Sequence, residues 1–240
     1  MPEQRRVVTT PDGPMDVYEA MPDGPARRAI VVIQEAFGVN RHIEDVTRRF
    51  AGLGYHAVAP ALFHRAGGGT IDDYDNLDFT KLFALFEGVT DDTILADVDA
   101  TLGLVTESGF DAAHTGIIGF CFGGRVTFLV AARRSLGAAV GFYGGGIVSA
   151  GHLPFPPLID ETKSLRTPWL GLFGDRDASI PVEDVERLRE ALRGAPLDAE
   201  VVRYPEAAHG FHCDARPDYH EASARDGWTR AQAWFEAHLA

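Results

Sequence analysis

Residues 119–124 read Gly-Phe-Cys-Phe-Gly-Gly and follow a short apolar stretch, residues 115–118. This is the pattern G-x-S-x-G of a sharp strand-to-helix turn, with Cys121 in the place of serine. Such a turn strains its central residue, and the small Gly119 and Gly123 let strand and helix pass closely. It also places Cys121 at a helix N-terminus, where free backbone N–H groups favour a thiolate. The segment therefore predicts a nucleophile elbow; a buried cysteine beside packing glycines is the alternative.

Segments typical of strands alternate with segments of helical period along the rest of the chain. Strands are expected over residues 5–10, 15–19, 29–33, 55–59, 115–118, 138–142, 169–173 and 200–204. Helices are expected over residues 40–53, 78–88, 91–108, 121–134, 182–193 and 219–239. This alternation predicts an α/β fold with a mostly parallel central sheet and helices on both faces. We expect residues 1–240 to form a single domain.

Composition restricts the partners. The chain has 22 basic and 35 acidic residues, a net charge of −13, which argues against nucleic-acid binding and against acidic lipid. No apolar run is long enough to cross a membrane, and residues 1–6 lack the apolar stretch of a signal peptide. Two cysteines do not suggest a disulfide framework. We expect a cytoplasmic protein with a small-molecule partner, no nucleic acid and no membrane; the sequence does not indicate an oligomeric state.

A thiol nucleophile needs a base, and the base needs an orienting acid. The strand over 169–173 is followed by a loop with Asp175 and Asp177, and the strand over 200–204 by a loop with His209. Nucleophile, acid and histidine thus follow one another in the α/β-hydrolase order, each after a strand. The carboxyl ends of parallel strands are also where ligands bind. We predict a triad of Cys121, Asp177 and His209, and favour Asp177 over Asp175 because it lies deeper in its turn.

With these features the chain resembles the dienelactone hydrolase family of α/β-hydrolases. The residues that carry the resemblance are 34–38, 60–65, 119–124, 174–181 and 204–211. The resemblance implies the same triad, with Glu35 helping to deprotonate the thiol when substrate arrives. It also implies an oxyanion hole formed by the backbone N–H groups of Ala36 and Phe122, and no metal or organic cofactor.

The resemblance further implies that Arg65 binds a substrate carboxylate. A second carboxylate-binding arginine is expected four residues after the histidine, where this chain has Cys213, and Arg216 three residues further on is a possible substitute. Glu35 could instead pair with Arg65 or Arg125, since a carboxyl at the end of a buried strand needs a partner or a proton. The aromatic residues Phe37, Tyr143 and Phe211 are candidates for an apolar substrate pocket, with core packing as the alternative.

The leaving-group ability of a thiolate restricts the class of substrate. A tetrahedral adduct on Cys121 expels the thiolate again unless the other leaving group is also good, so activated esters or enol lactones are favoured. We therefore predict a cysteine-dependent hydrolase that works through a thioester. Three other readings stay open: a small-molecule-binding protein without activity, a general carboxylesterase without dienelactone preference, and a redox pair of Cys121 with Cys213. A metal site is a further alternative, built from His209, His212, Cys213 and Asp214.

Overall fold

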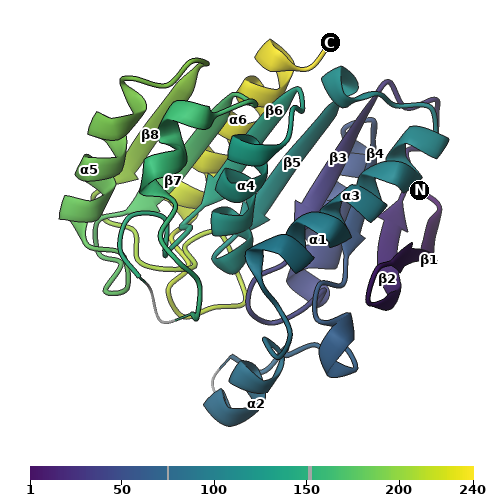
Figure 1. Cartoon of the computed structure of the whole chain (residues 1–240), viewed down its shortest axis with the longest axis horizontal. Coiled ribbons are helices and arrows are strands. Elements are labelled where there is room, and N and C mark those ends of the chain that lie inside the picture. Colours follow the sequence, from purple (N-terminus) through teal and green to yellow (C-terminus); the bar gives the residue numbers. More distant parts are fainter. Residues whose placement is uncertain (75, 151–152) are drawn as a thin grey trace. The chain divides into compact units, whose positions relative to one another are not determined.

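The computed structural model describes residues 1–74, 76–150 and 153–240. Internal contacts divide the chain into two compact units, which we call the N-terminal unit (Met1–Thr115) and the C-terminal unit (Gly116–Ala240). Each unit combines strands with helices (Figure 1). The expectation of a single domain over residues 1–240 stays a prediction.

The N-terminal unit contains four strands in the order β1-β2-β4-β3. Their bounds are Glu3–Thr10 (β1), Gly13–Ala20 (β2), Arg28–Ile33 (β3) and Tyr55–Pro60 (β4). Strands β1 and β2 form an antiparallel hairpin, β2 pairs antiparallel with β4, and β3 pairs parallel with β4. The apolar run of β3 is buried from its second residue to its end, as expected for a strand covered on both faces.

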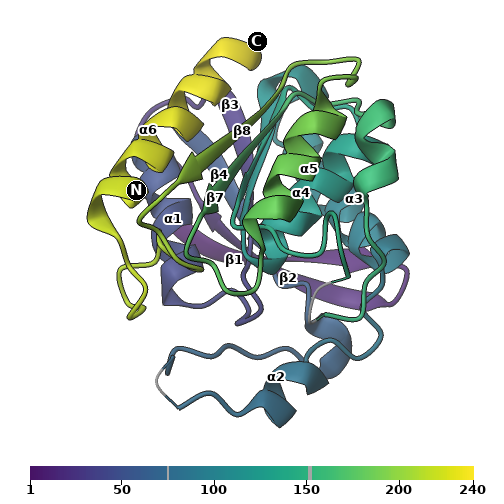
Figure 2. The same cartoon turned by 90° about the vertical axis from the view of Figure 1, so that its left-hand side faces the viewer.

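Two long helices flank these strands. The helices of this unit are α1 (Arg41–Gly52), α2 (Phe79–Ala84) and α3 (Asp91–Glu107), with 3₁₀ turns at His64–Ala66 and Ala112–His114. Helix α1 begins where the Asn40 side chain accepts a hydrogen bond from the Ile43 N–H. Helices α1 and α3 lie on opposite sides of the strands (Figure 2). Helix α2 is shorter than the predicted 78–88, and Gly88 beyond its end has a left-handed φ of 74°.

The C-terminal unit has four parallel strands in the order β5-β6-β7-β8. Their bounds are Thr115–Phe120 (β5), Ala138–Phe142 (β6), Trp169–Gly174 (β7) and Ala199–Tyr204 (β8). Because the strands are parallel and consecutive, their carboxyl ends meet at one edge. The segments that leave that edge begin at Cys121, Tyr143, Asp175 and Pro205.

Helices cover both faces of these strands. The helices are α4 (Phe122–Arg133), α5 (Val182–Leu192) and α6 (Glu221–His238), with a 3₁₀ segment at Ile159–Ser164. Helices α4 and α5 lie on one face and α6 on the other (Figure 1, Figure 2). The predicted mostly parallel sheet with helices on both faces is confirmed, since only the pairings of β2 are antiparallel in the described part of the chain.

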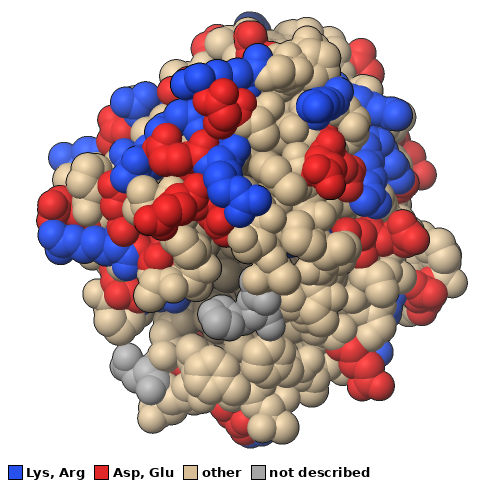
Figure 3. All heavy atoms as spheres, turned by 60° about the vertical axis from the view of Figure 1, so that its left-hand side comes forward, with Lys and Arg blue, Asp and Glu red and all other residues tan. Residues whose placement is uncertain are grey.

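Charges of both signs are interspersed on the face that carries α5 and β8 (Figure 3). Helix α5 contributes charges of both signs as ion pairs three residues apart: Asp184–Arg187, Glu186–Arg189 and Glu190–Arg193. Such pairs contribute at most about 1 kcal/mol each. In the described part of the chain, no helix combines the length and the apolar character that a membrane crossing requires.

The close approach of β5 and α4 yields a stability prediction. A Cβ on Gly119 would lie 2.2 Å from the carbonyl oxygen of Gly123, and neither backbone can give way easily. Gly119→Ala should therefore lower the free energy of unfolding by about 3 kcal/mol, the upper part of the range for overpacking. The measurement is urea denaturation followed by circular dichroism.

Gly103→Ala is the matched control. Gly103 is exposed within α3, and a Cβ there would meet no atom within 4 Å. Removing a glycine from a helix interior should raise stability by about 0.5–1 kcal/mol. Equal effects of the two substitutions would show that the Gly119–Gly123 approach does not constrain the elbow.

Candidate active site

The predicted elbow is present in the C-terminal unit. Cys121 caps the N-terminus of α4 with φ 54° and ψ −115°, a conformation that non-glycine residues rarely adopt. Its N–H donates to the Phe142 carbonyl oxygen at 3.0 Å, which ties the turn to β6. The thiol is partly exposed, and neither it nor the buried Cys213 forms a disulfide. The strained turn therefore lifts the sulfur out of the sheet edge.

The loops after β7 and β8 are held against each other. A Cβ on Gly174 would lie 2.3 Å from the Ala207 carbonyl oxygen, so the two backbones touch there. The Arg176 N–H donates to that same oxygen at 2.9 Å, and the Asp175 N–H donates to the Tyr204 carbonyl oxygen at 2.9 Å. The acid loop and the histidine loop are thus fixed in register before any side-chain contact is considered.

Three side chains from these turns form a continuous chain of contacts. The Nε2 of His209 lies 3.1 Å from the Cys121 Sγ, and its Nδ1 lies 2.6 Å from the Asp177 Oδ2. Asp177 is almost fully buried, while the His209 side chain is 22% exposed. Both ring nitrogens of His209 are therefore engaged, one by the sulfur and one by the carboxylate. The three side chains thus lie as the predicted nucleophile, base and orienting acid would require.

Neighbouring charges and hydrogen bonds shift the pKa values of His209 and Asp177. Burial disfavours the imidazolium of His209, but the negative charge on Cys121 and the hydrogen bonds to Asp177 and Cys121 outweigh it and raise the pKa of His209 to about 10. Burial likewise opposes ionisation of Asp177. The hydrogen bond to His209, the charge of His209 and the bonds from Ser179 overcome that cost and lower the pKa of Asp177. At neutral pH these shifts favour a protonated His209 beside an ionised Asp177.

Asp175, the rival candidate for the acid, has a different partner. It makes a bidentate pair with Arg203, at 2.7 Å from Nε to Oδ1 and 2.7 Å from Nη2 to Oδ2. Arg203 also donates to Glu186 at 2.6 Å, so Asp175 belongs to an ion-pair network on β8 and α5. Asp177, and not Asp175, contacts His209.

Aromatic side chains pack around the imidazole of His209. Tyr143 follows β6 with a left-handed φ of 38° and is fully buried, and its ring centroid lies 5.2 Å from that of His209. Phe211 is also fully buried, and its ring lies 5.2 Å from Tyr143. Both residues support the histidine loop in this structure; the substrate contact predicted for them stays a prediction.

The predicted oxyanion donor Phe122 is the first residue of α4. The first four N–H groups of a helix have no acceptor within the helix, so this amide is suited to bind a developing negative charge. The Phe122 ring stacks on Phe155 at 5.6 Å, and Phe155 lies under the guanidinium of Arg125. Arg125 also donates to the Pro156 carbonyl oxygen at 2.7 Å. Arg125 thereby fixes the segment after β6 to the start of α4.

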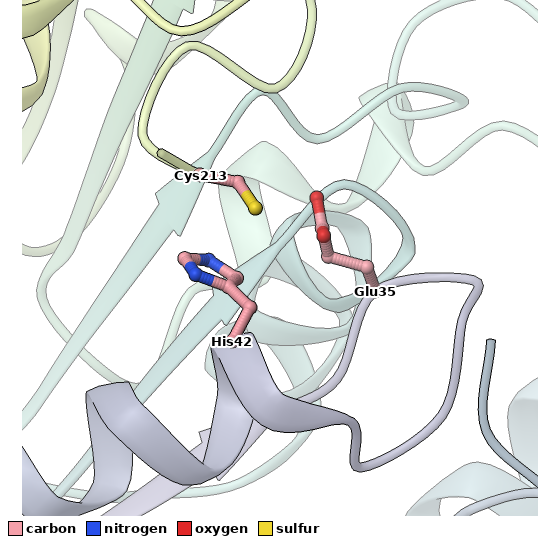
Figure 4. A group of neighbouring side chains, drawn as sticks. All are labelled: Glu35, His42 and Cys213. Atoms are coloured by element: carbon pink, nitrogen blue, oxygen red, sulfur yellow. The ribbon is translucent and has the colours of Figure 1, made fainter. Parts of the chain in front are cut away.

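In the N-terminal unit, residues 35–38 form a tight turn after β3. Glu35 and Gly38 bridge each other, and Ala36 and Phe37 between them are buried. Figure 4 shows the buried Glu35 side chain with that of His42 from the first turn of α1. A carboxylate oxygen of Glu35 and a ring nitrogen of His42 lie within 4.8 Å of each other. The catalytic role of Glu35 and the oxyanion role of Ala36 stay predictions.

Phe37 and its turn are anchored by the segment that follows β4. The Phe37 ring packs edge-on against Tyr74 at 5.1 Å, and the Phe37 carbonyl oxygen accepts from the Ile71 N–H at 2.9 Å. Gly38 has φ 77°, and a Cβ there would lie 2.3 Å from the Gly69 carbonyl oxygen. Only glycine therefore fits at position 38. The substrate contact predicted for Phe37 stays a prediction.

Arg65, the predicted carboxylate anchor, is already paired with acidic residues. Its Nη1 and Nη2 donate to the two oxygens of Asp97 at 2.6 and 2.9 Å, and its Nε donates to Asp12 at 2.7 Å. The Arg65 side chain is only 9% exposed, and that of Asp97 is fully buried. A substrate carboxylate would have to displace one of these acids. The sequence did contain an indication of this pairing. Asp97 lies on the buried face of a helix that also buries Ile94 and Val98, and a buried carboxylate needs a charged partner.

Arg216, the possible substitute for the second carboxylate-binding arginine, lies in the segment that follows β8. Gly210, directly after His209, has φ 82°, and a Cβ there would lie 2.5 Å from the Arg216 Cζ. The guanidinium therefore packs against the backbone beside His209. The role of Arg216 as a substitute for the second arginine stays a prediction. Cys213, at the position where that arginine was expected, is buried.

Comparisons with known proteins identify the family of the chain. The family model described as "Dienelactone hydrolase family" matches residues 15–239. A Salmonella typhimurium protein named "Putative carboxymethylenebutenolidase" is 46% identical over 228 residues, covering 92% of this chain and 82% of its own. The "Carboxymethylenebutenolidase" of Pseudomonas putida is 28% identical over 198 residues, covering 81% and 80%. The crystal structure of a Klebsiella pneumoniae protein described as a "Putative Dienelactone Hydrolase" superposes with a TM-score of 0.85 at 42% identity, covering 98% of this chain and 99% of that one.

The fold and these similarities define an ester hydrolase with the α/β-hydrolase fold. Within that class, the chain belongs to the dienelactone hydrolase family. The predicted fold, the predicted family and the prediction that the protein is an enzyme are confirmed. These similarities disfavour the alternative of a binding protein without activity.

Proposed function

We propose that the protein hydrolyses activated esters or enol lactones through a thioester on Cys121. The observation that carries the proposal is the chain of contacts Cys121–His209–Asp177, at 3.1 and 2.6 Å, in which the pKa of His209 is raised. A thiolate is the nucleophilic form of cysteine, and a protonated His209 beside the sulfur would stabilise it. The names of the relatives support a lactone as one member of the substrate class.

In the proposed acylation, the Cys121 thiolate attacks the substrate carbonyl carbon. The oxygen becomes an oxyanion, which the Phe122 N–H stabilises. The bond to the leaving oxygen then breaks, and the His209 imidazolium donates its proton to that oxygen. In a lactone the leaving oxygen stays attached to the acyl chain. The family resemblance extends the proposal to Glu35, which would assist formation of the thiolate, and to the Ala36 N–H as a second oxyanion donor.

Deacylation follows from the loss of charge at sulfur. The negative charge on Cys121 is the foremost influence that raises the pKa of His209, and acylation removes it. The neutral imidazole can then take a proton from water, which attacks the thioester carbonyl. The thiolate leaves, the carboxylic acid is released and the imidazolium is restored. His209 thus serves as acid in the first half and as base in the second.

The pKa of His209 provides a direct test of this charge coupling. In Cys121→Ala the sulfur charge is absent, so the pKa of His209 should fall well below the value of about 10 of the native enzyme. The sign follows because an anion stabilises the imidazolium, and its removal lets the proton leave at lower pH. NMR titration of the imidazole Cε1–H measures the shift. A histidine that still titrates near 10 in the variant would contradict the coupling.

Substrate preference tests the proposed activity. We expect wild-type enzyme to hydrolyse p-nitrophenyl acetate and a dienelactone much faster than an ethyl ester or an anilide, because only the first two have leaving groups that compete with a thiolate. Mass spectrometry after rapid acid quenching should find the acyl group on the peptide that contains Cys121. Hydrolysis of the anilide with comparable kcat/KM, or no acyl group on Cys121, would contradict the proposal.

One observation favours a general carboxylesterase over an enzyme that requires an anionic substrate. Arg65 is neutralised by Asp97 and Asp12, so the anchor that the resemblance implies is already occupied by acids. We therefore expect the methyl ester of a carboxylated dienelactone to be hydrolysed at least as fast as the free acid. A strong preference for the free acid would instead assign anion binding to this chain, and loss of that preference in Arg216→Ala would locate it at Arg216.

A further inference from the structure

Ser179 lies two residues after the catalytic acid and makes three contacts with the triad. Its hydroxyl donates to the Asp177 Oδ1 at 2.6 Å, and its backbone N–H donates to the same oxygen at 2.8 Å. The hydroxyl oxygen also lies 3.3 Å from the Nδ1 of His209. The other carboxylate oxygen, Oδ2, accepts the bond from that Nδ1.

We propose that Ser179 is a positioning residue, which locks the Asp177 carboxylate in the rotation that presents Oδ2 to His209 and so orients the imidazole toward Cys121. The role rests on the proposed function, since it serves the same thiol. A carboxylate with one free oxygen can rotate about its terminal bond, where side chains have broad preferences. Two donors on Oδ1 remove that freedom.

Charge gives the hydroxyl a second effect. Bonds from a neutral hydroxyl to an ionised carboxylate are short and stronger than neutral pairs. Burial raises the pKa of Asp177, and the hydrogen bond and charge of His209, followed by the hydroxyl and N–H of Ser179, lower it. Asp177 therefore remains an anion facing the imidazolium.

The surroundings of Ser179 decide how a variant behaves. Ser179 is exposed, and it lines a cavity of about 300 Å³ whose walls include Ile147, Phe173, Ile180 and Val185. A water molecule can therefore enter the position of a deleted hydroxyl and bond to the carboxylate in its place. A methyl group in that position would keep the water out. The Ser179→Ala and Ser179→Val variants should consequently differ in kcat.

Threonine and valine form the matched pair for the test, because they have the same shape and differ only in the hydroxyl. Ser179→Thr should keep kcat for p-nitrophenyl acetate within about twofold of wild type, because the donor remains. Ser179→Val should lower kcat by about tenfold or more with little change in KM, since a charge-assisted bond is lost without replacement. Ser179→Ala should lie between the two. Equal midpoints of thermal unfolding would show that all variants are folded.

A second readout separates this role from the proposed function. The rate of alkylation of Cys121 by iodoacetamide at pH 7, followed by mass spectrometry of its peptide, reports the thiolate without any ester. We expect Ser179→Val to be alkylated several-fold more slowly than Ser179→Thr. Equal alkylation and equal kcat for the two variants would overturn the proposal, and so would a wild-type thiol inert to iodoacetamide. If wild type is alkylated but hydrolyses no ester, the proposed function fails while the alkylation rates still decide the role of Ser179.

Discussion

Replacing Cys121 by alanine is expected to lower kcat/KM for p-nitrophenyl acetate by at least about 10³-fold, as removal of a covalent nucleophile does in other hydrolases. The physical reason is that no other group in the described elbow presents a nucleophile to the Nε2 of His209, which lies 3.1 Å from the sulfur. The oxyanion donors and the orienting acid remain, so activity above the uncatalysed rate should persist. Stopped-flow measurement of p-nitrophenolate release should show no burst in the variant.

Cys213→Ala is the control for this experiment. Cys213 is the other cysteine of the chain and is fully buried, so it cannot contribute a solvent-accessible thiol. The control should retain activity close to that of wild type, with some loss of stability from the cavity. Activity of Cys121→Ala above about 1% of wild type, or equal losses in the two folded variants, would rule out Cys121 as the nucleophile.

The elbow could be predicted because its signals are local. The apolar strand, the spacing of Gly119 and Gly123 and the order of the later loops are all visible in the chain. The further glycine contacts around α4 could not be predicted in the same way. A Cβ on Gly144 would lie 2.6 Å from the Gly124 carbonyl carbon, and a Cβ on Gly141 would lie 2.8 Å from the Gly124 oxygen. These contacts depend on which strand lies beside β5, and the local sequence does not determine the order of the strands.

Charge partners were the least predictable part. The sequence indicated an arginine at position 65 for anion binding, but Asp12 and Asp97 are 53 and 32 residues away from it and were not identified as its partners. The sequence distinguished Asp177 from Asp175 only by depth in the turn, whereas the structure shows that Arg203 engages Asp175. Ser179 was missed, although a serine two residues after an aspartate is a common source of local hydrogen bonds.

Asp177→Asn is expected to lower kcat by about 10²- to 10⁴-fold, the range in which the equivalent change in a serine triad falls. An amide at this position has no charge to stabilise the imidazolium. It can also turn its NH₂ toward the Nδ1 of His209, which favours the tautomer that is protonated on Nε2 and cannot accept a proton there. The variant should fold, because an asparagine side chain has almost the same volume and can still bond to Ser179. The measurement is kcat for p-nitrophenyl acetate across pH 6 to 9.

The matched control is Asp175→Asn, two residues earlier in the same loop. Its carboxylate binds Arg203 at 2.7 Å and does not contact His209 in the described structure, so kcat should stay within about twofold of wild type. Because Arg203 retains Glu186 as a partner, the loss of stability should be small. Full activity of Asp177→Asn together with loss of activity in Asp175→Asn would reverse the assignment of the acid. Loss of activity in Asp177→Asn alone would show that the carboxylate at 2.6 Å from the imidazole, and not the general negative charge of the loop, holds the base in its working state.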